Sequence, residues 1–139
     1  MRHALIITLL VACGGGTPAP TGTVCADPDP GALTYANFGK PFMEKYCTWC
    51  HAADIPRSQR NGAPIYHDYD SLLGVLETPD HIDEQAGSGP DASNAFMPPS
   101  RCPSVAGGSV NMSCAQPTEE ERQQLAEWIA CERHRPHTF

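Results

Sequence analysis

The sequence predicts an all-α fold: a small helical domain with long loops, preceded by an export leader. Two amphipathic segments, over residues 34–46 and 118–131, predict the first and last helices. No run of alternating apolar and polar residues indicates a strand. The 14 prolines and 12 glycines among 139 residues indicate long loops. The 7 cysteines indicate that disulfide cross-links or a bound cofactor stabilise a small core.

Residues 1–12 have the pattern of a signal peptide. Arg2 precedes an apolar run, Ala4 to Ala12, that is too short to cross a hydrocarbon layer of about 30 Å as a helix. The run ends in Leu-Val-Ala-Cys, which resembles the lipobox of bacterial lipoproteins and makes Cys13 the candidate lipidation site. We therefore expect a membrane-anchored lipoprotein facing the periplasm. A cleaved leader with a soluble periplasmic product is the alternative.

A Gly/Pro/Thr-rich tether over residues 13–31 is predicted next, followed by the folded domain at 32–133 and a tail at 134–139. In the first helix, aromatic residues recur every three or four positions from Tyr35 to Tyr46. Pro41 lies inside this segment, so the helix is expected to be kinked or to begin near Gly39.

Three further helices are predicted from their start signals. Asp70 is the expected N-cap of a short helix that ends at Glu77, and Thr78-Pro79 starts the next one. Residues 87–117 are expected to be loop. Thr118 with Glu121 three positions later forms a capping box for the last helix. Its apolar face is expected to consist of Leu125, Trp128 and Ile129.

The formal net charge is −7. An acidic protein of this size repels nucleic acid, so nucleic acid is excluded as a partner. Redox protein partners with a basic docking patch fit the charge better.

The segment Cys47-Thr48-Trp49-Cys50-His51 matches C-x-x-C-H, the attachment pattern for c-type haem. The two thiols add across the haem vinyl groups to form thioethers, and the adjacent imidazole ligates the iron. The motif therefore predicts one covalently bound haem c. Three other readings are a thioredoxin-like redox pair, a zinc site completed by Cys102 and Cys114, and a structural disulfide.

The segments CTWCH, NAFMPPS and EEERQQLAEWIACE together resemble a class I cytochrome c domain, of the kind found in small lipoprotein cytochromes of Gram-negative bacteria. This resemblance covers about residues 32–133. It implies a small all-α fold in which the first and last helices cross near one haem edge. It also implies that Phe42 or Met43 packs against Trp128, and that His51 and Met97 are the axial iron ligands.

The sequence itself favours Met97 over the other methionines. Met43 lies inside the first helix, too close to the attachment motif, and Met112 lies in a polar loop. Met97 precedes Pro98-Pro99, which stiffen the backbone. The histidines at positions 67 and 81 remain competitors for the second ligand.

His51 is expected to donate its other ring N–H to a backbone carbonyl. The resemblance points to Pro64 as the residue that carries this carbonyl, and Pro56 is the alternative.

Four cysteines remain: Cys25, Cys102, Cys114 and Cys131. In an exported chain they predict two disulfides, with three possible pairings. We prefer Cys102–Cys114, a local clip after the methionine loop, and Cys25–Cys131, which joins the tether to the last helix.

These observations predict a monohaem c-type cytochrome, a periplasmic electron carrier with His/Met iron coordination. No second haem motif and no nucleophile–base spacing indicates an enzyme. The alternatives are a haem-based sensor of a gas or peroxide with a labile methionine ligand, and an accessory haem module of a respiratory complex.

Overall fold

The first predicted helix is present in two parts. The computed structural model describes residues 17–26 and 33–139, so the signal peptide, Cys13 and part of the tether lie outside the described residues. A π-helical turn, η1 (Tyr35–Gly39), runs directly into α1 (Lys40–Tyr46). Pro41 occupies the first turn of α1, directly after η1.

The middle of the chain forms three short helical elements and a hairpin. A 3-10 turn, η2 (Arg57–Gln59), is followed by α2 (Leu72–Glu77) and α3 (Pro79–Ala86). α3 begins at Pro79, as predicted. The N-cap of α2 is Ser71 and not Asp70, because the Ser71 hydroxyl accepts a hydrogen bond from the Gly74 N–H at 3.1 Å.

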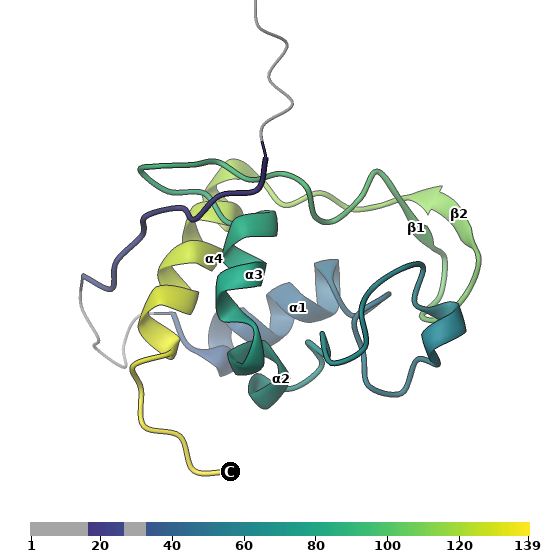
Figure 1. Cartoon of the computed structure of the whole chain (residues 1–139), viewed down its shortest axis with the longest axis horizontal. Coiled ribbons are helices and arrows are strands. Elements are labelled where there is room, and N and C mark those ends of the chain that lie inside the picture. The colour runs from purple at the N-terminus through teal and green to yellow at the C-terminus, as the bar shows by residue number, and fades with distance from the viewer. Residues whose placement is uncertain (1–16, 27–32) are drawn as a thin grey trace, which may run out of the picture.

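The all-α prediction is wrong. β1 (Arg101–Pro103) and β2 (Val110–Ser113) form a two-stranded antiparallel sheet inside the region expected to be loop, so the fold is mixed α/β. In Figure 1 this hairpin lies at the opposite end of the molecule from α4. Both strands are very short, and the register shifts between Cys102 and Pro103. For this reason the sequence shows no alternation of apolar and polar residues that would predict them.

α4 (Glu119–Glu132) follows the Thr118–Glu121 capping box that the sequence predicted. Its predicted apolar face is confirmed, since Leu125, Trp128 and Ile129 are all fully buried. They belong to one core that includes residues of all four α-helices. The buried members of this core are Phe42, Met43, Tyr46, Tyr69, Val75, Ile82, Ala86, Leu125, Trp128 and Ile129.

The first and last helical segments meet at Gly39. A Cβ atom placed on Gly39 would lie 2.2 Å from Cζ2 of Trp128, so only glycine allows this approach. The Trp128 ring also contacts Phe38 and Tyr35, with ring centroids 6.1 and 6.3 Å apart. Phe42 and Met43 share the core with Trp128, but the crossing point itself lies one turn earlier, in η1.

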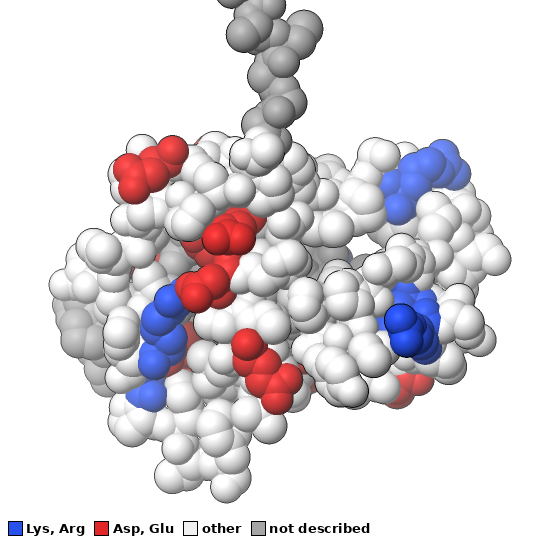
Figure 2. All heavy atoms as spheres, in the orientation of Figure 1, with Lys and Arg blue, Asp and Glu red and all other residues white. Residues whose placement is uncertain are grey.

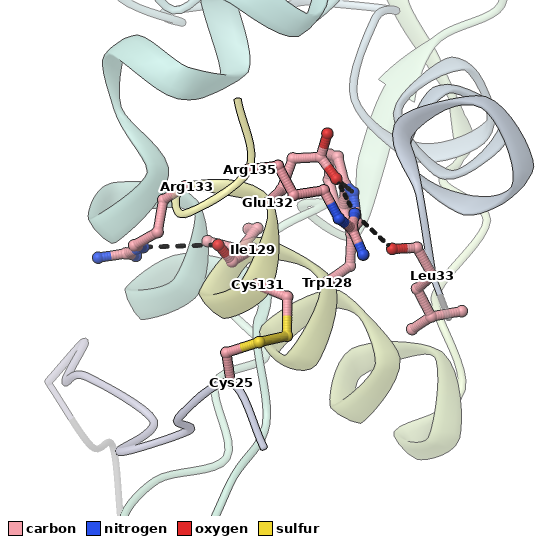
Figure 3. The surroundings of a disulfide bond; sticks show 8 residues. All are labelled: Cys25, Leu33, Trp128, Ile129, Cys131, Glu132, Arg133 and Arg135. Carbon is pink, nitrogen blue, oxygen red and sulfur yellow. Dashed lines mark hydrogen bonds and ion pairs between the residues drawn. A yellow bond between two sulfur atoms is a disulfide. The ribbon is translucent and has the colours of Figure 1, made fainter. Parts of the chain in front are cut away.

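The structure contains both predicted disulfides, Cys25–Cys131 and Cys102–Cys114. The first spans 106 residues and holds the 17–26 segment against the end of α4 (Figure 3). A cross-link over a loop of this length stabilises a fold by about 4.7 kcal/mol in the chain-entropy model. Two disulfides fit an oxidising, exported environment. Across residues 17–26 and 33–139, no helix is long and apolar enough to span a bilayer.

The end of α4 is fastened by a buried polar cluster, shown in Figure 3. The Trp128 indole N–H donates to the Glu132 carboxylate at 3.0 Å, and Arg135 forms an ion pair with the same carboxylate. Arg135 also donates to the Leu33 carbonyl at 2.7 Å. The residues after α4 therefore tie the helix back to the start of the domain.

Glu121 joins α4 to α1 through its carboxylate. It accepts hydrogen bonds from the Thr118 N–H at 2.8 Å, from the Tyr46 hydroxyl at 2.8 Å and from Lys45 at 3.1 Å. The Thr118 N–H is the largest of the influences that lower the pKa of Glu121 to about 2.

We expect the Glu121 carboxylate to make stability depend on acidity. Its folded-state pKa lies below the ordinary value of 4.5, so its contribution is complete above pH 4.5 and is lost as the pH falls toward 2. Chemical denaturation should show the free-energy gap between wild type and Glu121→Gln narrowing between pH 6 and pH 2.5. Glu120→Gln, at an exposed position in the same turn, serves as control, and an equally narrowing gap in that variant would show that the effect is not specific to Glu121.

Candidate functional site

A single cavity gathers most of the residues that the sequence singled out. Its volume is about 310 Å³, within the roughly 300–1,000 Å³ range of small-molecule and cofactor sites. Cys47, Cys50, His51 and Met97 all line it. Figure 2 shows the surface hollowed between the half formed by α3 and α4 and the end that carries the hairpin. Among residues 17–26 and 33–139, neither an aspartate nor a glutamate lines the cavity.

The C-x-x-C-H motif forms a turn at the end of α1. Cys47 is the C-cap of the helix, and its carbonyl accepts hydrogen bonds from the N–H groups of Cys50 at 3.2 Å and His51 at 3.0 Å. This turn places two thiols and an imidazole along one wall of the cavity. Local sequence alone therefore brings three of the predicted site residues together.

Cys47 and Cys50 are free thiols, whereas Cys25, Cys102, Cys114 and Cys131 are paired. The structural-disulfide alternative for the motif is therefore not what the structure shows. A zinc site completed by Cys102 and Cys114 is also wrong, because these two cysteines are bonded to each other. No group of three or more His, Cys, Asp or Glu within residues 17–26 and 33–139 is placed to hold a metal ion on its own.

The two thiols do not have the properties of a redox-active dithiol. Burial raises the pKa of Cys47 to about 12 and also raises that of Cys50, whereas reactive cysteines have a lowered pKa that favours the thiolate. The two-stranded hairpin provides no βαβ unit among the described residues. These features argue against the thioredoxin-like reading.

His51 is oriented by a backbone carbonyl, as expected, but the carbonyl belongs to His67. The Nδ1–H of His51 lies 3.1 Å from the His67 oxygen, so the assignment to Pro64 and the alternative Pro56 are both wrong. The Tyr69 N–H donates to the His51 carbonyl at 2.9 Å, which aligns residues 67–69 beside the motif. Pro64 lies instead on the cavity wall.

Arg60 fixes this arrangement, and sequence reasoning missed it. Its side chain is only 3% exposed and donates to the carbonyls of Cys50 at 3.2 Å and His67 at 2.8 Å. It also forms an ion pair with Asp68 at 2.6 Å. The Arg60 guanidinium thus links the C-x-x-C-H turn to the His67 carbonyl, which orients His51. A hydrogen bond from an arginine to distant carbonyls leaves no signal in the sequence.

The His51 ring is packed for ligation through its second nitrogen. Burial lowers the pKa of His51 to about 4, with the His67 carbonyl opposing this shift, so the imidazole is neutral at pH 7. Its ring stacks on Tyr69 with centroids 4.7 Å apart. Among the described residues Nε2 has no hydrogen-bond partner. A neutral imidazole with one nitrogen engaged and one available is the form that binds a metal.

Met97 is held through its backbone. Its N–H donates to the Gln85 carbonyl at 2.9 Å, and its own carbonyl accepts from Arg122 at 2.9 Å. The Met97–Pro98 peptide is cis, and Gln116 donates to the carbonyls of both prolines that follow. Met97 lines the cavity and is 39% exposed.

The two competing histidines differ in position. His81 lines the cavity, whereas His67 does not. The His67 ring lies beside His81 with centroids 4.8 Å apart, behind the ring of His51. His81 is therefore the one histidine of the pair that shares the cavity with Met97.

Comparison of the chain with family models, with curated proteins and with solved structures finds no match.

The residues of the cavity fit a covalently attached haem. Two adjacent free thiols, a neutral imidazole with an available nitrogen and a thioether all open onto one cavity. Imidazole and thioether are an established axial pair for haem iron. The cavity volume is of cofactor size. Cys47, Cys50, His51 and Met97 form the donor set that such a group requires.

Proposed function

We propose that the protein is a monohaem c-type cytochrome, an electron carrier exported to the periplasm. The observation that supports this best is the meeting of both thiols, the His51 imidazole and the Met97 thioether in one cavity, although Met97 lies far from the motif in the sequence. When bound, haem c supplies a one-electron Fe(III)/Fe(II) couple.

The chain's own residues have distinct tasks in this proposal. Cys47 and Cys50 hold the group covalently, each through addition of S–H across a vinyl double bond, a step that needs no oxidant. His51, oriented by the His67 carbonyl, provides one axial nitrogen. Met97 would provide a soft sulfur as the second ligand, which would raise the reduction potential relative to a second imidazole. The resemblance to class I cytochrome c domains supports the same assignments.

Membrane attachment through an acylated Cys13 is part of the proposal. A lipid-anchored carrier would remain close to membrane-bound redox partners. Two acyl chains give a stable anchor, whereas one gives only marginal binding. The mass of the protein extracted from membranes tests the lipid at Cys13.

The partners are proposed to be redox proteins with a basic docking patch. In Figure 2, acidic side chains, with some basic ones between them, gather over α3 and α4, whereas basic side chains stand at the end that carries the hairpin and η2. A basic patch therefore fits the α3 and α4 half better than the hairpin end.

The experiment that tests the proposal is a visible spectrum with a pyridine haemochrome, on protein made in a host with cytochrome c maturation. A covalently bound haem that resists acid-acetone extraction is the expected result. Protein that matures without covalently bound iron-protoporphyrin would refute the proposal.

Met97→Ala should leave this haem attached and abolish the long-wavelength Met–Fe(III) absorption band, because the thiols and His51 are held by other parts of the fold. The reduced variant should bind carbon monoxide readily, since one axial position is open. Met112→Ala is the matched control, because Met112 is exposed on β2 and does not line the cavity. Survival of the band in Met97→Ala would identify another ligand, with His81 the first candidate.

A further inference from the structure

Arg122 is a buried cation in the second turn of α4. It is 5% exposed, and its Nη1 donates to three backbone carbonyls: Ala86 at 3.0 Å, Asn94 at 3.0 Å and Met97 at 2.9 Å. Among the described residues, no carboxylate lies within ion-pair distance of this guanidinium. The side chain therefore serves carbonyl oxygens rather than an acidic partner.

Packing alone does not require a charge at this position. Burying an ion costs several kcal/mol unless hydrogen bonds compensate for the lost water. An apolar side chain would fill the space between α4 and α3 without that cost. The three carbonyls come from the end of α3 and from the loop that follows it, where no helical N–H is available to them. The hydrogen-bond donors of Arg122 therefore satisfy backbone carbonyls of this loop and of the end of α3.

The Met97 loop has two attachments near the methionine. Gln85 of α3 accepts hydrogen bonds from the N–H groups of Phe96 and Met97, at 3.0 and 2.9 Å. Arg122 of α4 holds the carbonyl side of Met97. Without Arg122, the backbone of Met97 would keep its link to α3 and lose its link to α4.

We propose that Arg122 is the positioning residue for the Met97 ligand: by donating to the carbonyls of Ala86, Asn94 and Met97, it holds the thioether at the cavity and limits its dissociation from iron. This inference rests on the proposed function, since it concerns the second axial ligand of a bound haem. It gives α4 a role beyond its packing against η1.

The attachment motif does not share this dependence. The Cys47–His51 turn is held by its own hydrogen bonds and by Arg60, and Arg122 donates to no carbonyl of that turn among the described residues. Loss of Arg122 should therefore affect Met97 and leave the covalent haem in place.

The test uses Arg122→Met in the matured, haem-bearing protein, with imidazole as the probe. Imidazole binds ferric iron only where Met97 has dissociated, so its apparent affinity reports the equilibrium between bound and dissociated methionine. Leaving buried carbonyls unsatisfied should raise this affinity roughly tenfold or more. The pH at which the Met–Fe(III) band disappears on alkaline titration should fall. The haemochrome should be unchanged.

Arg135→Met is the matched control. Arg135 is also a largely buried arginine, three residues after the end of α4, and it contacts Leu33 and Glu132, away from the Met97 loop. The Arg135→Met variant should have a lower free energy of unfolding and the same apparent imidazole affinity as wild type. An imidazole affinity that is unchanged in Arg122→Met, or raised equally in Arg135→Met, would overturn the inference.

If Arg122→Met does not fold, Arg122→Lys decides the question. A lysine keeps the charge, but its nitrogen lies one bond nearer the backbone than the Nη1 of Arg122, which donates to all three carbonyls, so the imidazole affinity should still rise. An affinity equal to that of wild type would overturn the inference and leave the proposed function intact. A wild-type protein with attached haem but no Met–Fe(III) band would refute Met97 ligation, and this inference with it. Absence of the haem itself would refute the proposed function.

Discussion

Replacing Cys47 and Cys50 together by serine is expected to yield a protein with no covalently bound haem. Serine hydroxyls are close in size to the thiols but do not add to vinyl groups under the conditions in which thiols do. The other four described cysteines are paired in disulfides, so none of them can substitute for Cys47 and Cys50. Haem staining after denaturing electrophoresis should show complete loss, the largest effect that any two substitutions in this chain are expected to have.

The matched control for this pair is Cys102→Ser with Cys114→Ser. It also removes two cysteines from the cavity wall, but these two form the hairpin disulfide and are not available to a cofactor. The control protein should keep its haem stain and become less stable. Equal loss of stain in both double variants would show that the haem depends on cavity shape, and the assignment of the thioethers to Cys47 and Cys50 would fail.

Gly39→Val is expected to be the most destabilising single substitution in the fold. A Cβ at this position would lie 2.2 Å from the Trp128 ring, which is fully buried. To admit the new side chain, the indole must leave its site, at a cost close to that of removing it, about 3–5 kcal/mol. Since small domains are stable by about 5–15 kcal/mol in total, chemical denaturation should show most of the stability lost.

Ala36→Val provides the control for the added β-branched side chain, because Ala36 lies in the same π-helical turn and faces solvent. Its free energy of unfolding should change by well under 1 kcal/mol. Adding Trp128→Ala to Gly39→Val should cost much less than Trp128→Ala costs alone, since the clash is then absent. Fully additive effects of the two substitutions would contradict a direct contact at this crossing.

The parts of the fold that depend on neighbouring residues could be predicted from the sequence. The Thr118–Glu121 capping box, the start of α3 at Pro79 and the turn of the C-x-x-C-H motif all depend on residues within three or four positions of one another. The Cys25–Cys131 pairing was reachable because only four cysteines remained and an exported chain tends to pair them.

The hairpin could not be predicted, and its absence from the expectation made the fold class wrong. β1 has three residues, including Cys102 and Pro103, and β2 is exposed along its whole length, so neither strand has an alternating apolar face. The pairing is favoured by the Cys102–Cys114 disulfide, which closes the hairpin next to its first paired residues. A tertiary constraint outweighed the local pattern here.

In the candidate site, only the residues whose side chains carry the candidate ligand atoms could be predicted from the sequence. Cys47, Cys50, His51 and Met97 carry side chains whose chemistry can be read from their type, and all four reach the cavity. Arg60 and Arg122 could not be found in this way, because each donates to backbone carbonyls outside its own helical turn, which any residue type can provide. For the same reason, the carbonyl that orients His51 was assigned to Pro64 and not to His67, because every residue has a backbone carbonyl.

The strap formed by residues 17–26 determines how a mechanical load enters the domain. Thr21 is hydrogen-bonded to Asp83 of α3, and Cys25 is covalently joined to Cys131 of α4. A force applied at the N-terminal end of this strap is therefore transmitted to α3 and α4 before it reaches the turn at Cys47. If the protein is anchored through Cys13, as proposed, tension from the membrane would be borne by α3 and α4 and not by the Cys47–His51 turn.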